Sequence, residues 1–316
     1  MCTAVSLKAE NRYFGRNLDL DVSYNEAVTV TMRRYPFRFT CGKTVDCHYA
    51  IIGMAAVVNN YPLYFEATNE KGLSMAGLNF PDNAVYFSKA DGAAVDNVSP
   101  FEFIPWVLSR SADIGEARKI LERVNLCDIP FSRELPLSPL HWFVSDGDES
   151  IVVESVAEGL KIYDDPLDVL TNNPPFPYHL ENIKNYINLK VTDPEETVFV
   201  RNRVTPYSVG LGAFGLPGDY SSASRFVRAS FVLNNTAEET GEKACVNRFF
   251  HILSSVAMPK GCVKLGNGRY EYTRYSCCCN ADKGVYYYTT YENREIRSVD
   301  MYGEGLDGAD LVIYPI

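Results

Sequence analysis

The sequence lacks any run of the roughly 20 apolar residues that a membrane-spanning helix needs. Its first thirty residues also lack the apolar core of a signal peptide, because Lys8, Glu10, Asn11 and Arg12 interrupt the apolar stretch. Positive charge is not in excess either: the formal net charge is -10, which disfavours binding to the phosphate backbone of nucleic acids. These absences predict a cytoplasmic protein with no membrane insertion and no nucleic-acid partner.

Cysteine and histidine residues also lack the close spacing that is typical of metal-binding motifs. The nine cysteines include no CxxC pair, and the four histidines lie far from one another in the sequence, so we expect no structural zinc site. The triplet Cys277-Cys278-Cys279 is interpreted as small strand residues that are buried or half-buried, with a redox or metal role as the alternative.

No internal repeat, low-complexity tract or linker divides the chain. With 316 residues, of which 46% are hydrophobic, the sequence can bury a large core. We therefore predict one domain over residues 1–316.

Strand patterns dominate both ends of the chain, and helical patterns lie between and after them. We expect strands at residues 2–8, 12–17, 27–33, 50–57, 73–79, 270–278, 284–291 and 295–300. We expect helices that begin at Pro100 and after Asp113, and further helices at residues 178–189, 222–235 and 237–257. This order predicts an α+β fold rather than repeated βαβ units.

The start of the chain carries candidate chemistry. Cys2 directly follows Met1, and a small residue at this position permits removal of the methionine, which leaves a thiol and a free α-amine on one residue. Such an amine, with an ordinary pKa of about 7.7–8.0, can carry protons near neutral pH, and a thiol gains nucleophilicity beside a cation. If residues 2–8 and 12–17 pair as a hairpin, Arg16 lies near Cys2 and favours the thiolate, while Asp19 orients the α-ammonium. On this pattern alone, an inert cysteine with a solvated Arg16 and Asp19 remains an alternative.

Longer motifs resemble those of the choloylglycine hydrolase family, which holds bile salt hydrolases and penicillin V acylases. They occur in order over nearly the whole chain, and it is the set rather than any single motif that is specific. The motifs are Met1-Cys2-Thr3, FGRNLD (Phe14–Asp19), NEKGL (Asn69–Leu73), AGLNFP (Ala76–Pro81), LTNNP (Leu170–Pro174), GLPGDYSSASRF (Gly215–Phe226), FFHILSSVAMPKG (Phe249–Gly261) and YYYTTYEN (Tyr286–Asn293).

The resemblance implies an Ntn-hydrolase fold, a four-layer αββα sandwich with two antiparallel sheets. It also implies a homotetramer that needs no metal and no organic cofactor. The catalytic positions that it implies are Cys2 as nucleophile, Arg16 and Asp19 as the residues that tune the thiolate and bind the amine, Asn79 as oxyanion-hole donor, Asn172 beside the nucleophile, and Arg225 as an active-site arginine. Without the resemblance, Asn79, Asn172 and Arg225 would be interpreted as loop, turn and surface residues.

The same resemblance implies a substrate. Penicillin V acylases often carry Tyr at the position of Asn79, so the asparagine favours glycine- or taurine-conjugated bile salts, whose amide bond would be hydrolysed to free bile acid and amino acid. By family position, the steroid would contact Leu18, Tyr24, Tyr61, Phe65, Phe131 and Leu137, although each is also compatible with ordinary packing. Arg133 is a candidate partner for a taurine sulfonate, with a solvated loop arginine as the alternative.

Other functions stay open at this point. The same chemistry could act on penicillin V or on another N-acyl compound, such as an N-acyl lactone. A non-catalytic protein that binds steroids or fatty acids is a different class, and it would retain ligand binding without Cys2.

Overall fold

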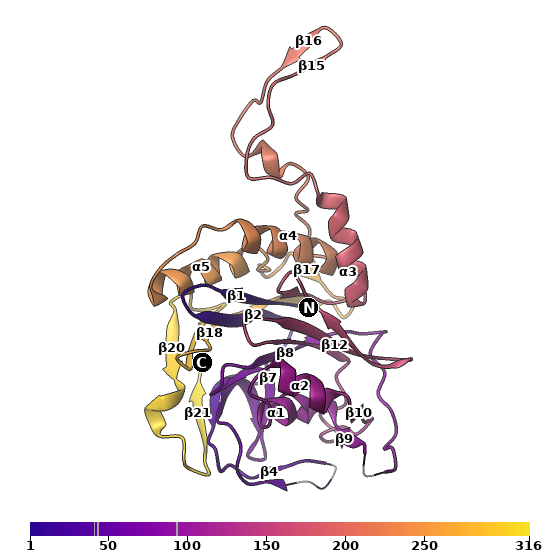
Figure 1. Ribbon diagram of the computed structural model, residues 1–316, viewed down its shortest axis with the longest axis vertical. Coiled ribbons are helices and arrows are strands. Elements are labelled where there is room, and N and C mark those ends of the chain that lie inside the picture. Colours follow the sequence, from indigo (N-terminus) through magenta and orange to yellow (C-terminus); the bar gives the residue numbers. More distant parts are fainter. Residues whose placement is uncertain (41, 43, 93) are drawn as a thin grey trace.

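Two antiparallel β-sheets stack face to face at the centre of the molecule (Figure 1). The computed structural model describes residues 1–316 apart from Cys41, Lys43 and Ala93. The seven-stranded sheet has the order β14 (Val169–Leu170), β1 (Cys2–Lys8), β2 (Arg12–Leu20), β18 (Tyr270–Asn280), β19 (Val285–Thr290) and β20 (Arg297–Asp300), with β17 (Val263–Lys264) paired to β18. The eight-stranded sheet has the order β13 (Gly159–Asp164), β12 (Ser150–Val156), β11 (Leu140–Ser145), β8 (Ser74–Asn79), β7 (Tyr61–Asn69), β6 (Ile51–Val58), β3 (Ala27–Thr31) and β21 (Leu311–Pro315).

Helices cover the outer face of each sheet (Figure 1). On the seven-stranded sheet lie α4 (Ser222–Asn235) and α5 (Glu242–Ser254), with α3 (Phe176–Asn182) beside them; on the eight-stranded sheet lie α1 (Phe103–Leu108) and α2 (Ile114–Leu121). The expected α+β fold, a four-layer αββα sandwich with two antiparallel sheets, is confirmed.

Shorter strand pairs and 3₁₀ segments lie outside the two large sheets. They are the strand pairs β4 (Phe37–Arg38) with β5 (Thr44–Val45), β9 (Asp96–Val98) with β10 (Val124–Leu126) and β15 (Thr197–Phe199) with β16 (Asn202–Val204), and the 3₁₀ segments Pro100–Glu102, Ile183–Tyr186, Leu211–Ala213 and Met301–Glu304. The β15–β16 hairpin stands far out from the sandwich, beyond α3 (Figure 1). In the described part of the chain, no helix is long and apolar enough to cross a membrane.

Several predicted elements differ from the structure. Helix α4 has the predicted bounds, but the helix expected at 237–257 begins only at Glu242 and ends at Ser254. Gly241 has a φ of 83°, outside the right-handed helical region, and the polar residues before it form a loop. The helix expected at 178–189 begins earlier, at Phe176, directly after Pro175, and narrows to a 3₁₀ turn after Asn182.

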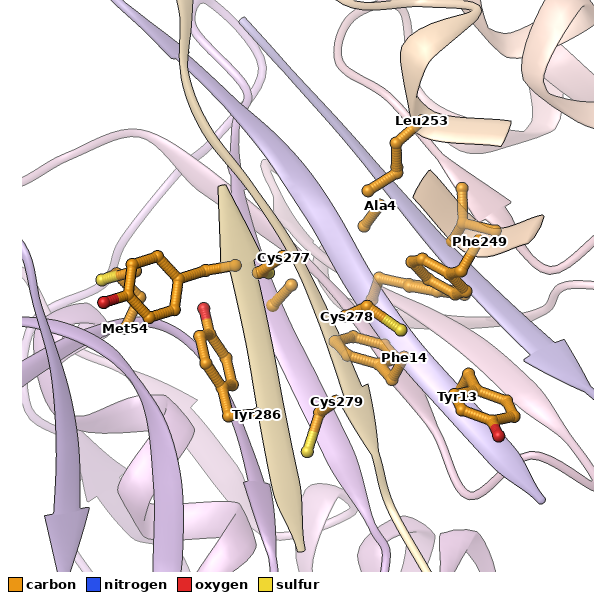
Figure 2. Packing of buried hydrophobic residues seen from close by; sticks show 14 of the residues in the cluster. Ala4, Tyr13, Phe14, Met54, Phe249, Leu253, Cys277, Cys278, Cys279 and Tyr286 are labelled. Carbon is orange, nitrogen blue, oxygen red and sulfur yellow. The ribbon is translucent and has the colours of Figure 1, made fainter. Parts of the chain in front are cut away.

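The packing between the layers explains the cysteine triplet (Figure 2). Cys277, Cys278 and Cys279 are all buried on β18, which confirms the interpretation as small strand residues. Their side chains alternate: the Cys277 thiol faces Glu66 of the opposite sheet, whereas Cys278 lies on the helix side, near Cys245 of α5. The triplet therefore fills space on both faces of one strand.

Candidate active site

The first two strands bring the N-terminal candidates together. Strands β1 and β2 pair as the predicted hairpin, with Cys2 opposite Leu18 and Ala4 opposite Arg16. Cys2 is 2% exposed, and it lines a cavity of about 680 Å³ together with Arg16 and Asn79. Cys2 thus lines a pocket whose volume is typical of small-molecule sites.

Asn172 connects the residues around Cys2. Its Oδ1 atom accepts hydrogen bonds from the Cys2 main-chain N–H at 2.8 Å and from Arg225 Nη2 at 2.7 Å. Its Nδ2 atom donates to the Asn79 carbonyl at 2.7 Å. One side chain therefore links the nucleophile candidate, an arginine of α4 and the end of β8.

Arg225 completes this network from the helix side. It is fully buried, and its Nη1 group donates to the carbonyl of Cys2 and, at 2.7 Å, to the hydroxyl of Thr3. Burial is the largest influence on its guanidinium and lowers the pKa, while Asp19 and Cys2 act in the opposite direction. A buried cation of this kind is tolerated because anionic and carbonyl groups surround it.

Asp19 faces the same region from β2. It is fully buried, its Oδ1 atom accepts from the Thr273 hydroxyl at 2.6 Å, and its Oδ2 atom has no hydrogen-bond partner among the described residues. Burial raises its pKa, and Arg225 and the terminal ammonium oppose that rise. In the chain that retains Met1, the ammonium of Met1 donates to the Asp19 carbonyl at 2.9 Å and pairs with the carboxylate of Glu271.

Arg16 lines the cavity from β2, and its guanidinium is buried. Its Nη1 group donates to the carbonyls of Gly77 at 2.6 Å and Phe65 at 3.0 Å. Burial acts to lower the pKa of Arg16, but Cys2, Tyr275 and Glu66 outweigh burial, so the pKa is raised. Arg16 is therefore a permanent cation on the wall of the cavity that Cys2 also lines.

Most of the predicted substrate residues line the cavity. Leu18, Tyr24, Phe65, Phe131 and Leu137 are on its wall. Tyr61 stands behind the wall, with its ring 5.9 Å from that of Phe131 and 6.0 Å from that of Phe101. Among the described residues, those on the wall do not include Arg133, whose side chain is exposed to solvent, whereas its neighbour Glu134 is on the wall.

Sequence patterns did not identify the rest of the site. The wall also includes Leu20, Ala56, Val58, Leu63, Tyr64, Phe101, Ile104, Leu135, Leu140 and Trp142. Thr273 of β18 donates to Asp19, and Glu66 of β7 lies 3.7 Å from Arg16; both come from strands far away in the sequence. No local spacing identifies these residues in the sequence. The sequence feature that could have indicated Glu66 is a glutamate within a largely apolar, strand-like segment.

Comparisons with known proteins give matches over nearly the whole chain. The family model described as linear amide C–N hydrolases, choloylglycine hydrolase family, matches residues 2–314. The bile salt hydrolase/transferase of Lactiplantibacillus plantarum is 52% identical over 316 residues, which cover 100% of this chain and 97% of that protein. The bile salt hydrolase/transferase of Clostridium perfringens is 36% identical, covering 99% of this chain and 96% of that protein.

Solved structures show the same fold. A mutant of the conjugated bile acid hydrolase from Clostridium perfringens superposes with a TM-score of 0.93 at 35% identity, covering 100% of this chain and 97% of that one. The penicillin V acylase from Agrobacterium tumefaciens superposes with a TM-score of 0.76 at 18% identity, covering 98% of this chain and 90% of that one, a likeness of fold alone.

Proposed function

This chain belongs to the choloylglycine hydrolase family of linear amide C–N hydrolases, and we propose that it hydrolyses the amide bond of glycine- and taurine-conjugated bile salts. The observation that carries this proposal is the position of Cys2 at an apolar cavity, with its main-chain nitrogen bound to Asn172 and its carbonyl to Arg225. The names of the relatives from Lactiplantibacillus plantarum and Clostridium perfringens support bile salts as the substrates.

The proposed mechanism begins with removal of Met1. The nitrogen of Cys2, now an amide N–H that donates to Asn172 Oδ1, then becomes a primary amine in the same place. Arg16 favours the thiolate, which attacks the amide carbonyl of the substrate and forms a C–S bond. The Asn79 side-chain amide, on the cavity wall, donates to the oxyanion.

The second half of the proposed mechanism releases the amino acid and the bile acid. The α-amine of Cys2, which takes up the thiol proton when the thiolate forms, delivers that proton to the leaving nitrogen, the C–N bond breaks, and glycine or taurine departs. Water then attacks the thioester, the C–S bond breaks, and the free bile acid leaves with the thiol restored. Asp19, within the field of the terminal ammonium, orients the amine through its buried carboxylate.

Release of glycine and taurine from a panel of conjugated bile salts tests this function, with protein shown by intact mass to begin at Cys2. We expect release by the parent and none by Cys2→Ser, because a hydroxyl near neutral pH is a far weaker nucleophile than a thiolate. Penicillin V assayed in parallel separates the alternative substrate class. Ligand binding without turnover in the parent would instead identify a non-catalytic binding protein.

We further propose that the protein is a homotetramer. The projecting segment around β15 and β16 exposes an unusual number of apolar side chains, which are Ile187, Val191, Val198, Phe199, Val200, Tyr207, Val209 and Phe214. Exposed apolar clusters of this kind are typical of protein interfaces. Light scattering of the parent and of Phe199→Glu tests this, with a fourfold mass expected for the parent only.

We also propose that the protein acts in the bacterial cytoplasm. The free thiols of Cys47 and Cys262 are exposed, and a reducing compartment keeps such thiols reduced. Fractionation of the producing cells, followed by an assay of each fraction, tests the location.

A further inference from the structure

A buried carboxylate stands behind Arg16, outside the machinery described above. Glu66 lies on β7 and is 1% exposed. Its Oε2 atom is 3.7 Å from Arg16 Nη1 and accepts from the Tyr275 hydroxyl at 2.7 Å. Its Oε1 atom accepts from the Tyr286 hydroxyl at 2.6 Å and from the Cys277 thiol at 3.5 Å. The carboxylate is thus held from β18 and β19 and aimed at the guanidinium.

A β-bulge produces this arrangement. Met54 and Ala55 of β6 pair with Glu66 and Tyr64, so Phe65 is an extra residue on β7. As a result, Phe65 and Glu66 both face the space between the sheets, the first on the cavity wall and the second against Tyr275, although they are adjacent. Bulges next to active sites commonly redirect side chains in this way.

The same irregularity opens a place for the guanidinium. Pairing of β7 with β8 ends at Glu66 and Ala76. Arg16 Nη1 binds the carbonyls of the next residues, Phe65 and Gly77. The Nε and Nη2 groups of Arg16 are buried and have no hydrogen-bond partner among the described residues. Within the described part of the chain, Arg16 is thus anchored through Nη1, and Glu66 is the carboxylate paired with it.

A buried guanidinium without a counter-charge is strongly disfavoured. Burial, the largest influence, raises the pKa of Glu66, while Arg16 and the hydroxyls of Tyr286 and Tyr275 act against that rise. The groups that face the carboxylate are therefore a cation and neutral donors, which stabilise its ionised form. If Glu66 were neutral, Cys2 would be the main group left to balance Arg16, since Cys2 contributes most to raising the pKa of Arg16.

We propose that Glu66 is a positioning residue that holds Arg16 and balances its charge, and thereby sets how readily the Cys2 thiol ionises. This inference rests on the proposed function in one respect, namely that the thiol of Cys2 is the nucleophile. It adds a residue that does not touch substrate, since the described residues on the cavity wall do not include Glu66.

The test measures alkylation of Cys2 by iodoacetamide between pH 5 and 9, with peptide mapping of the modified residue. Protein that begins at Cys2 is used, and exposed Cys47 and Cys262 serve as internal references. In Glu66→Gln, we expect the pH midpoint of Cys2 alkylation to fall by about one unit, because the thiolate replaces the lost counter-charge. The reference cysteines should keep their midpoints.

Two further variants separate charge from packing. Glu66→Asp keeps the charge but withdraws it by one methylene, so its midpoint should lie between those of the parent and Glu66→Gln. Tyr286→Phe removes a donor from Oε1, the oxygen not paired with Arg16, but leaves the carboxylate beside Arg16, so its midpoint should move less than that of Glu66→Gln. If Glu66→Gln does not fold, the pH midpoint of Cys2 alkylation in Glu66→Asp is compared with that of the parent, and a lower midpoint supports the proposal.

Kinetics supply a second readout. We expect Glu66→Gln to lower kcat for glycocholate by roughly 10- to 100-fold, because a displaced Arg16 misplaces charge at the reacting atoms. KM should stay within twofold of the parent. A midpoint equal to that of the parent in every folded Glu66 variant would overturn the proposal. Alkylation needs no substrate, so failure of bile-salt hydrolysis in the parent would count against the proposed function and leave this test intact.

Discussion

Replacement of Asn172 by alanine removes the side chain that joins Cys2, Arg225 and Asn79. The variant loses two hydrogen bonds to Oδ1, at 2.8 and 2.7 Å, and one from Nδ2, at 2.7 Å. The neighbouring residue provides a matched control. The Asn173 side chain donates to the carbonyl of Pro81 and is more exposed than that of Asn172. Asn172→Ala and Asn173→Ala thus make the same chemical change at adjacent positions.

The cost of Asn172→Ala follows from the kinds of bond lost. A neutral hydrogen bond contributes about 1 kcal/mol and one to a charged group about 2 kcal/mol, so the loss is about 4 kcal/mol. A protein of ordinary stability stays folded at 25 °C after such a loss, with a Tm lower by roughly 10 °C. Asn173→Ala should cost less than about 1 kcal/mol.

Activity should fall much further than stability. If Asn172 holds the α-amine of Cys2, its loss is comparable to the loss of one preorganised catalytic hydrogen-bonding group, so kcat should fall by roughly 100- to 1,000-fold. KM for glycocholate should change little, because the described residues on the cavity wall do not include Asn172. Asn173→Ala should retain kcat within twofold.

The assay is glycine release at 25 °C, with circular dichroism to confirm that each variant is folded. Asn172→Asp divides the effect, since it keeps the acceptor for Cys2 and Arg225 but loses the donor to the Asn79 carbonyl. A folded Asn172→Ala enzyme with kcat within threefold of the parent would refute the assigned role of Asn172.

Three further outcomes are expected. A Cβ atom on Gly15 would lie 1.9 Å from the Cys277 carbonyl oxygen, so Gly15→Ala should lose more than about 4 kcal/mol in urea unfolding, whereas Gly218→Ala, in open space, should not; equal stability of the two would contradict this packing. Burial lowers the pKa of His179 to about 4, against about 6.5 in the unfolded chain, so as pH falls the unfolded state binds the proton first. The stability from neutral His179 is complete above about pH 6.5 and is lost towards pH 4, so His179→Gln should reduce the fall in unfolding free energy between pH 7 and 4.5 by roughly 2–3 kcal/mol, and an unchanged fall would count against it. Arg133→Ala should leave the ratio of taurine to glycine release within twofold, because the residues on the cavity wall do not include Arg133 among those described. A fivefold loss of taurine release would instead support the hypothesis that Arg133 pairs with the sulfonate.

Local patterns predicted the elements whose signals lie within a few residues. The hairpin of β1 and β2 was predicted from two strand-like segments that are close in sequence, and helix α4 has the predicted bounds. Strands β11, β12 and β13 were not predicted. The first two are buried on both faces, so their apolar residues do not alternate with polar ones.

The sequence by itself determined the family, the sandwich and the thiol at the second position, because ordered motifs and short-range periodicity record these features along the chain. The tertiary structure alone decided which distant groups share the site. Glu66 meets Arg16 only because a bulge in β7 turns it inward, and Asp19 meets Thr273 because β2 and β18 are neighbours in one sheet. A polar side chain acquires its chemical role from the groups that face it after burial, and strands far apart in sequence supply those groups.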